Sequence, residues 1–188
     1  MTSPSDAVTS ATWAAGGPAV NFSMEFNLSA RDGKLWIARE EWRTELKLKG
    51  ANWAGFQASG CVHELWKHSA DEYIAHLASH GFNAVRIPLS SAFVRSNRQI
   101  PDDYICGRHY ENWRTLSVLD DVVKKLRVAG LFVMLDVHTL THPEHNQECW
   151  CIDCSGGCSE SETQLLMDTW RILARRYCAQ PNVIMADS

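Results

Sequence analysis

Several polar side chains that could take part in chemistry lie at the ends of apolar runs in this chain. The run that begins at Leu131 ends in Asp136 and His138. Ligands bind at the carboxyl ends of parallel strands in α/β folds, so His138 is a candidate site residue. The alternative is a core histidine satisfied by a neighbour, and position alone does not decide between the two. Asp136 points the same way as His138 from a strand, and we predict that it orients neighbouring polar groups.

The same arrangement, polar side chains at the end of a strand candidate, recurs at Arg86 and at Asn52 and Trp53. Arg86 lies in residues 83–88, a short segment typical of a buried strand, and its guanidinium there needs an anionic or hydrogen-bonding partner. Asn52 and Trp53 end a second strand candidate, residues 45–53. We expect one of these two side chains to face the site and the other to pack.

The cysteines are numerous and unevenly spaced. Four of the seven form a cluster after His138 with two histidines close by, whereas Cys61 and Cys106 are isolated. The members of the cluster are Cys149, Cys151, Cys154 and Cys158, and the histidines are His142 and His145. Four soft ligands could hold zinc, but the spacing is not that of two C-x-x-C arms. We favour disulfides that stiffen a loop, expect surface positions for both histidines and assign no metal site.

The elements that position these residues alternate between strands and helices. Ser69-Ala-Asp-Glu72 has the capping-box spacing and predicts a helix to about Ser79. Residues 116–126 carry apolar side chains at helical spacing, and Ser161-Glu-Thr-Gln164 predicts the start of a third helix. With a last strand at 182–187, the pattern requires a parallel sheet. No strand is followed by a glycine-rich phosphate loop, so we expect no nucleotide and no other cofactor.

The N-terminal region differs in composition from the rest. Residues 1–20 are rich in small residues and predict a flexible leader, without the apolar core of a signal peptide. Residues 21–45 predict a hairpin, with strands at 22–26 and 34–37 and a turn at Arg31-Asp-Gly33. The main domain is then residues 46–188.

Composition excludes several classes of protein. A net charge of −4 with interspersed signs argues against a nucleic-acid partner, and the apolar runs are too short to span a membrane. The chain has eight tryptophans, several of them in stretches typical of loops. Exposed indoles suit the flat faces of sugar rings, although a single tryptophan more often packs at the rim of a core.

Four segments together resemble glycoside hydrolase family 5, the cellulase-like enzymes with a TIM (β/α)8 barrel. They are Leu48-Lys-Gly-Ala-Asn-Trp-Ala-Gly-Phe56, Gly81-Phe-Asn-Ala-Val-Arg-Ile-Pro-Leu-Ser90, Gly130-Leu-Phe-Val-Met-Leu-Asp-Val-His138 and Pro181-Asn-Val-Ile184. They agree in order and spacing, so the resemblance is more specific than any single motif. It implies an α/β barrel of which residues 46–188 form the N-terminal half, about the first four βα units.

The resemblance implies roles for individual residues. Arg86 matches the arginine that holds the nucleophilic carboxylate in place, and His138 matches a histidine that lines the subsite of the scissile sugar. Asn52 and Trp53 match the end of the first barrel strand. Retaining hydrolysis needs two carboxylates, which the family carries after its fourth and seventh strands. We expect both beyond Ser188, so no residue of this chain is assigned as catalytic.

The resemblance thus predicts that the full-length form is an O-glycosyl hydrolase that cleaves β-glucan or a related polysaccharide outside the cell. We expect the 188-residue chain to be inactive and poorly soluble alone, because half a barrel exposes an unpaired strand edge and needs the C-terminal half as partner. The alternative is a non-catalytic truncated barrel that at most binds carbohydrate.

Overall fold

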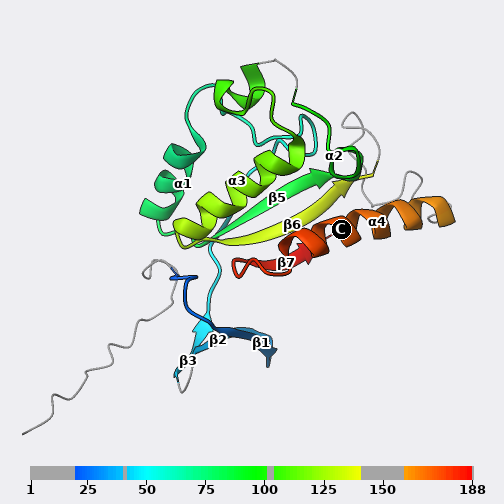
Figure 1. The fold of residues 1–188 in the computed structure, drawn as a ribbon. Helices are drawn as coiled ribbons and strands as arrows, with labels where there is room; N and C mark the ends of the chain where they lie inside the picture. The colour runs from blue at the N-terminus through cyan, green and yellow to red at the C-terminus, as the bar shows by residue number, and fades with distance from the viewer. Residues whose placement is uncertain (1–19, 40–41, 101–103, 141–158, 188) are drawn as a thin grey trace, which may run out of the picture.

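The computed structural model describes residues 20–39, 42–100, 104–140 and 159–187. The predicted leader, apart from Val20, and the Cys149–Cys158 cluster lie outside these residues. The described chain forms an antiparallel sheet, a parallel sheet and a layer of helices (Figure 1).

The antiparallel sheet contains the predicted hairpin and one additional strand. Its strands are β1 (Asn27–Arg31), β2 (Lys34–Arg39) and β3 (Trp42–Leu46), in that order. Asp32 and Gly33 join β1 to β2 with φ values of 54° and 70°, the positive angles that a two-residue hairpin turn requires. Residues 22–26 were expected to form the first strand, but this prediction is wrong: they precede β1 and fold as a turn and irregular chain.

The parallel sheet has the predicted strands in the order of the chain. They are β4 (Gly50–Asn52), β5 (Ala84–Ser90), β6 (Phe132–Thr139) and β7 (Val183–Asp187). Residues 45–53 were predicted as one strand, which is wrong, because residues 47–49 separate β3 from β4. One segment therefore supplies a strand to each of the two sheets.

Pro88 lies inside β5 rather than ending it. The backbone of Arg86, two residues earlier, faces β4, since its carbonyl accepts from the Trp53 N–H at 2.9 Å. Alternate residues of a strand direct their backbone groups to the same side, so the Pro88 nitrogen also faces that side, beyond the end of β4. No ladder hydrogen bond is lost there, and β5 continues to Ser90.

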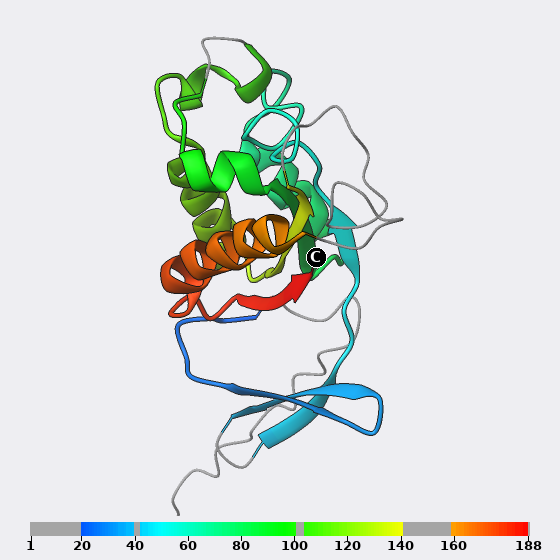
Figure 2. The same ribbon diagram turned by 90° about the vertical axis from the view of Figure 1, so that its right-hand side faces the viewer.

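The helices lie on one side of the parallel sheet (Figure 2). They are α1 (Ala70–Ser79), α2 (Ser91–Ser96), α3 (Thr115–Val128) and α4 (Glu160–Tyr177), with 3-10 turns η1 (Tyr104–Cys106) and η2 (Arg108–Tyr110). The capping box predicted for α1 is present, with Ser69 and Glu72 bonded to each other's backbone N–H groups. The box of α4 uses Ser159 and Glu162, two residues before the predicted Ser161 and Gln164.

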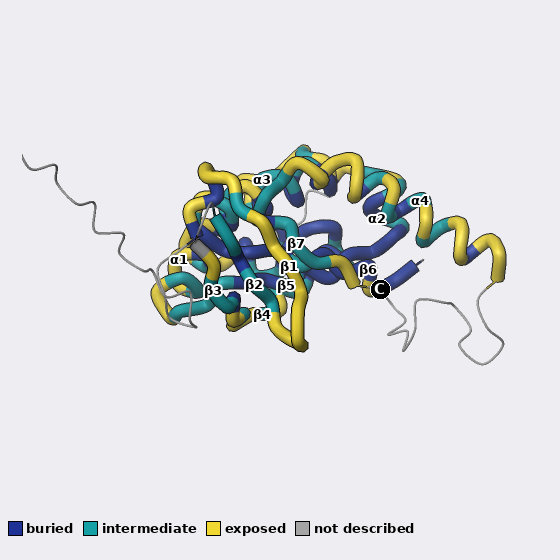
Figure 3. Tube along the Cα trace, turned by 90° about the horizontal axis from the view of Figure 1, so that it is seen from below, coloured by how far each residue is buried: buried dark blue, intermediate teal, exposed yellow. Residues whose placement is uncertain are grey.

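The core fills the space between this sheet and the helices. Its strand side chains alternate along β5 and β6, and its largest helix contribution comes from α3. The residues involved include Val85, Ile87, Leu89, Val133, Leu135, Val137, Leu119, Val123 and Leu126. Figure 3 shows β5 and β6 largely buried, whereas β1 is exposed throughout. The residues between these core positions in β5 and β6 therefore point to the opposite face of the sheet.

A second apolar cluster lies where the parallel strands begin. Phe22 packs edge-to-face on Phe132, the first residue of β6, with ring centroids 5.0 Å apart. Ile37 and Leu46 of the antiparallel sheet are buried in the same cluster. The N-terminal segment therefore covers the amino ends of the strands and leaves their carboxyl ends to form a site.

Candidate functional site

Four polar residues meet at the carboxyl ends of β4, β5 and β6. The Arg86 Nη1 group donates to Asn52 Oδ1 at 2.9 Å, which joins β5 to β4. Its Nη2 group lies 2.7 Å from Asp136 Oδ2 on β6. His138 Nδ1 lies 3.0 Å from the same carboxylate oxygen. Asn52, Arg86 and His138, which the sequence analysis singled out, are therefore brought together, with Asp136 between the last two.

The strands place these side chains away from the helices. Val133, Leu135 and Val137 of β6 pack in the core beneath the helices. Asp136 and His138 are two residues apart on β6, so they share the face opposite to those core residues. The alternation that buries β6 against the helices also directs its polar residues to the other face.

Asp136 is the most deeply buried member of the group. Its side chain is 4% exposed, whereas Arg86 and His138 are 33% and 41% exposed. Burial raises the pKa of the Asp136 carboxyl, and the charges of Arg86 and His138 only partly oppose this effect. Asp187 on β7 adds a further repulsion that raises the pKa. A perturbed carboxyl in contact with an arginine and a histidine is typical of a functional site.

The contact with Asp136 favours a proton on Nδ1 of His138, although Oδ2 of Asp136 has no aligned hydrogen-bond partner. An ionised carboxylate repels the lone pair of an unprotonated ring nitrogen, so the 3.0 Å distance favours hydrogen on Nδ1. In the neutral ring the Nε2 atom is then an acceptor, available to a ligand. Arg86 Nη2 lies 3.5 Å from the same Nδ1, and this contact is a hydrogen bond only in the other tautomer, in which Nδ1 accepts from the guanidinium.

Trp53 lies apart from this group. Its Nε1–H donates to the His63 carbonyl at 3.3 Å, and its ring meets Tyr73 of α1 edge-to-face with centroids 5.7 Å apart. The indole is partly buried against the main core. Asn52, the last residue of β4, therefore contacts Arg86, whereas Trp53, the next residue, packs against Tyr73.

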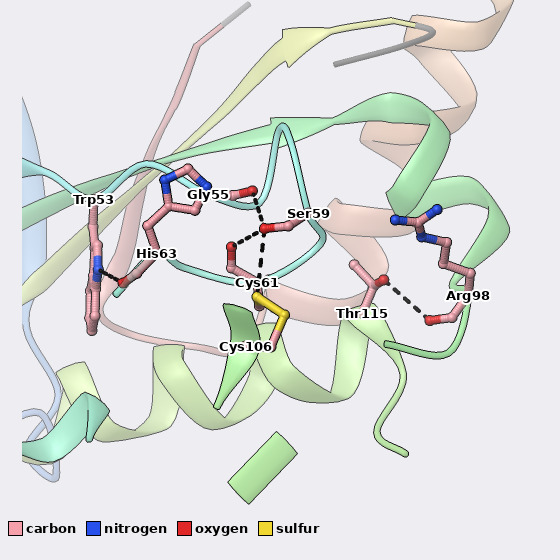
Figure 4. The surroundings of a disulfide bond; sticks show 8 residues. All are labelled: Trp53, Gly55, Ser59, Cys61, His63, Arg98, Cys106 and Thr115. Atoms are coloured by element: carbon pink, nitrogen blue, oxygen red, sulfur yellow. Dashed lines mark hydrogen bonds between the residues drawn. A yellow bond between two sulfur atoms is a disulfide. The ribbon is translucent and has the colours of Figure 1, made fainter. Parts of the chain in front are cut away.

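A disulfide that was not predicted from the sequence holds the loop after β4. Cys61 and Cys106 are bonded, with Cα atoms 5.7 Å apart, and both are buried (Figure 4). Ser59 Oγ donates to the Gly55 carbonyl at 3.1 Å within the same loop. Gly55 has a φ of 136°, and a Cβ there would collide with the Cys61 carbonyl oxygen. The sequence carried no pairing signal, because the two cysteines are 45 residues apart.

No metal or membrane feature accompanies the site in the described ranges. Within them, no three histidine, cysteine or acidic side chains are close enough to share a metal ion. No helix among the same residues is both long and apolar enough to cross a membrane. The clustered cysteines, for which zinc was an alternative, fall outside the described residues.

Comparison with known families gives a match over most of the chain. The family described as "Cellulase (glycosyl hydrolase family 5)" matches residues 22–188. This range contains both sheets, the helices and the Arg86 site.

Curated relatives are endoglucanases. The "Major extracellular endoglucanase" of Xanthomonas campestris pv. campestris is 31% identical over 183 residues, which cover 92% of this chain and 33% of that protein. An "Endoglucanase" of Paenibacillus polymyxa is 28% identical over 157 residues, covering 79% of this chain and 36% of that protein. The chain thus spans about a third of the length of these relatives.

Solved structures give the same result for the fold. The endocellulase of Pyrococcus horikoshii in complex with cellotetraose superposes with a TM-score of 0.71 at 27% identity, over 87% of this chain and 43% of that one. The catalytic domain of the Xanthomonas campestris endoglucanase gives a TM-score of 0.63 at 29% identity, over 77% and 40%. The β4–β7 sheet and its helices therefore correspond to part of a cellulase barrel.

Proposed function

The chain belongs to glycosyl hydrolase family 5, the cellulase family, and from that premise we propose that residues 46–188 form one side of the substrate site of a β-glucan hydrolase. The observation that carries this proposal is the single Asp136 oxygen that contacts both Arg86 and His138. Because this carboxylate is buried and contacts both partly exposed side chains, it holds them at fixed positions. Such pre-organisation suits a site that must hold a sugar ring and a carboxylate at fixed positions relative to each other.

Arg86 is proposed to position the nucleophilic carboxylate of a retaining mechanism. A guanidinium has five N–H donors, and the Asn52 and Asp136 contacts account for two of them. The side chain is one-third exposed, so its remaining donors can meet a second carboxylate. Arg86 is thus a positioning residue in this scheme.

His138 and Asn52 are proposed to contact the sugar. With hydrogen on Nδ1, which faces Asp136, the Nε2 atom of His138 can accept from a sugar hydroxyl. Asn52 uses its Oδ1 on Arg86, which leaves its amide N–H groups for a hydroxyl oxygen. Trp53 supports the site from behind by packing on Tyr73.

None of the carboxylates in residues 1–188 is proposed as the acid/base or the nucleophile. Asp136 is 4% exposed and in ion-pair contact with Arg86 and His138, so it cannot reach a glycosidic oxygen. The sequence contains no Asn-Glu-Pro motif, in which the family carries its acid/base glutamate. We therefore propose that the 188-residue polypeptide does not hydrolyse polysaccharide by itself.

The substrate and location are proposed from the relatives. The Pyrococcus horikoshii neighbour was solved with cellotetraose, which favours a β-1,4-linked glucan for this site. The Xanthomonas relative is named extracellular, and a buried disulfide is characteristic of oxidising compartments. We propose secretion for the protein in its functional form.

Strand order suggests how the site is completed. β4 and β7 are the edge strands of the described parallel sheet. Unpaired edges of this kind lead to aggregation, and in a barrel they pair with further strands. We propose the C-terminal half of a family 5 barrel as the partner of this sheet.

A complementation assay tests the proposal. The 188-residue polypeptide is assayed for reducing-sugar release from carboxymethyl-cellulose, alone and mixed with the part of the Xanthomonas catalytic domain that it does not align with. We expect no release alone and measurable release from the mixture, abolished by Arg86→Ala but not by Arg171→Ala, an exposed arginine on α4. Release by the polypeptide alone overturns the proposed inactivity.

The non-catalytic alternative gives a different result. A truncated barrel that only binds carbohydrate would bind cellotetraose in calorimetry, lose this binding in His138→Ala, and show no release in any mixture. If neither cellotetraose binding nor release is observed, the proposed sugar site is wrong.

A further inference from the structure

Two histidines lie one above the other on the last turn of α1. His76 and His80 are four residues apart, both are exposed, and their ring centroids are 4.2 Å apart. Residues at i and i+4 share one face of a helix, so both imidazoles project into the same volume of solvent. This position is at the amino end of the parallel strands, away from Arg86, because α1 returns the chain from the carboxyl end of β4 to the start of β5.

A backbone contact fixes the proton of one ring. His80 Nδ1 lies 2.8 Å from the His76 carbonyl oxygen and 3.2 Å from Ser79 Oγ. A carbonyl oxygen only accepts, so Nδ1 carries the hydrogen and the Nε2 lone pair is free. In metal sites, a histidine ligand typically donates its other ring N–H to a carbonyl or carboxylate, which orients the ring and fixes its tautomer.

We propose that His76 and His80 bind a divalent ion of the Zn²⁺, Cu²⁺ and Ni²⁺ class. Two histidines at i and i+4 on a helix are a known ligand pair for zinc, and imidazole nitrogen suits all three ions. The pair supplies two ligands, and water completes the coordination. With two protein ligands instead of three or four, the site binds more weakly than a structural zinc site.

The neighbouring carboxylate does not complete a third ligand. Glu72 lies one turn before His76 on the same face, but its Oε2 accepts from the Ser69 N–H at 2.8 Å and its Oε1 lies 3.7 Å from His68 Nδ1. The capping box thus holds Glu72 at the start of the helix. This agrees with the absence, among described residues, of any three-ligand group.

A cation in the same region leaves the imidazoles free. Lys49 Nζ donates to the His80 carbonyl at 2.7 Å and lies over the Phe82 ring. Its charge is therefore held on the main chain and an aromatic face rather than on either ring. A bound ion would add a crosslink across the last turn of α1 and stabilise the folded state by mass action.

Paramagnetic NMR of the 188-residue polypeptide, kept in solution by a small fused domain that lacks histidine and cysteine, tests this site directly. Substoichiometric Cu²⁺ is expected to broaden the amide signals of residues 76–82, because broadening reports distance from the ion rather than total affinity. This readout separates the pair from the cysteines outside the described residues, which can bind metal elsewhere. The variants His76→Ala and His80→Ala are each expected to weaken the local effect by at least about tenfold in Cu²⁺ concentration.

His68→Ala is the matched control, since it removes an exposed histidine near the start of the same helix. It should leave the broadening of residues 76–82 unchanged. Absence of broadening in the unmodified chain, or its persistence in the double variant, overturns the proposal. His76→Gln and His80→Gln remove the imidazole while keeping a helix-compatible side chain, so they decide the question if an alanine variant loses helix in circular dichroism.

Discussion

The ring of His138 rests on the carboxylate of Asp136, two residues earlier on the same face of β6, with Nδ1 3.0 Å from Oδ2. The same oxygen lies 2.7 Å from Nη2 of Arg86 on the neighbouring strand. One buried atom therefore contacts two partly exposed side chains. A substitution of Arg86 or His138 should therefore alter the position of the other side chain through Asp136.

Arg86→Ala should destabilise the fold as well as alter the site. It leaves the 4%-exposed Asp136 carboxylate without its guanidinium partner. Breaking a fully buried ion pair costs about 3–5 kcal/mol, and because Arg86 is one-third exposed we expect about 1–3 kcal/mol in urea denaturation. Arg171→Ala, which breaks an exposed pair with Asp168, should cost less than about 0.5 kcal/mol. Equal effects of the two substitutions would show that the Asp136 pair does not stabilise the fold.

Asp136 should make stability fall as pH rises through the acid range. Its pKa is raised in the folded state, chiefly by burial, so the folded protein binds a proton more tightly than the unfolded chain does. Its contribution is therefore most favourable below the unfolded value, near 3.8, and is lost as pH rises through the raised folded value. The difference in unfolding free energy between the unmodified protein and Asp136→Asn should decrease over that interval.

Glu72 provides a control of opposite sign for this measurement. Its hydrogen bonds to Ser69 lower the pKa of the carboxyl, so its contribution is present at neutral pH and lost as pH falls. The corresponding difference for Glu72→Gln should therefore increase with pH. A difference for Asp136→Asn that also increases with pH would contradict the assignment of burial as the dominant cause.

The elements that the sequence predicted best are those with local signals. The helix at Ala70–Ser79 was located by its capping box, and the buried run of β6 by its continuous apolar residues. The meeting of Asn52, Arg86 and His138 followed from the rule that parallel strands align their carboxyl ends. That rule does not reveal that Asp136 shares one oxygen between two of them, because this depends on the register of β5 and β6.

The missed features depend on tertiary contacts. Phe22 and Phe26 have the alternation of a strand, but burial against Phe132 determines their conformation instead. The bond between Cys61 and Cys106 joins the loop after β4 to the 3-10 turn η1, and only the fold brings these segments together. Local patterns carry no information about such partners.

The structure places the N-cap of α4 at a different serine from the one that the sequence predicted. The spacing in the sequence indicated Ser161, whereas the structure has Ser159 Oγ accepting from the Glu162 N–H at 3.2 Å. Ser159→Ala should therefore cost about 1 kcal/mol in urea denaturation, the usual value for a lost cap. Ser161→Ala should cost less than about 0.5 kcal/mol. A larger loss of stability in Ser161→Ala than in Ser159→Ala would show that Ser161 is the N-cap.

The disulfide should be a major contributor to stability. It closes a loop with a sequence separation of 45 and is fully buried. The chain-entropy model gives about 4 kcal/mol for such a loop, and measured values are commonly about 2–4 kcal/mol. Cys61→Ser with Cys106→Ser should therefore lower the urea midpoint and also loosen the loop that carries Trp53.

Cys178→Ser controls for the general effect of replacing cysteine by serine, since Cys178 is exposed and not in a disulfide. It should change stability by less than about 0.5 kcal/mol. Because both sulfurs of the Cys61–Cys106 bond are buried, a reductant can reach them only through opening of the fold. The urea midpoint of the unmodified protein should fall under dithiothreitol toward that of the double variant. A double variant as stable as the oxidised protein would show that the bond constrains neither the loop nor the unfolded chain.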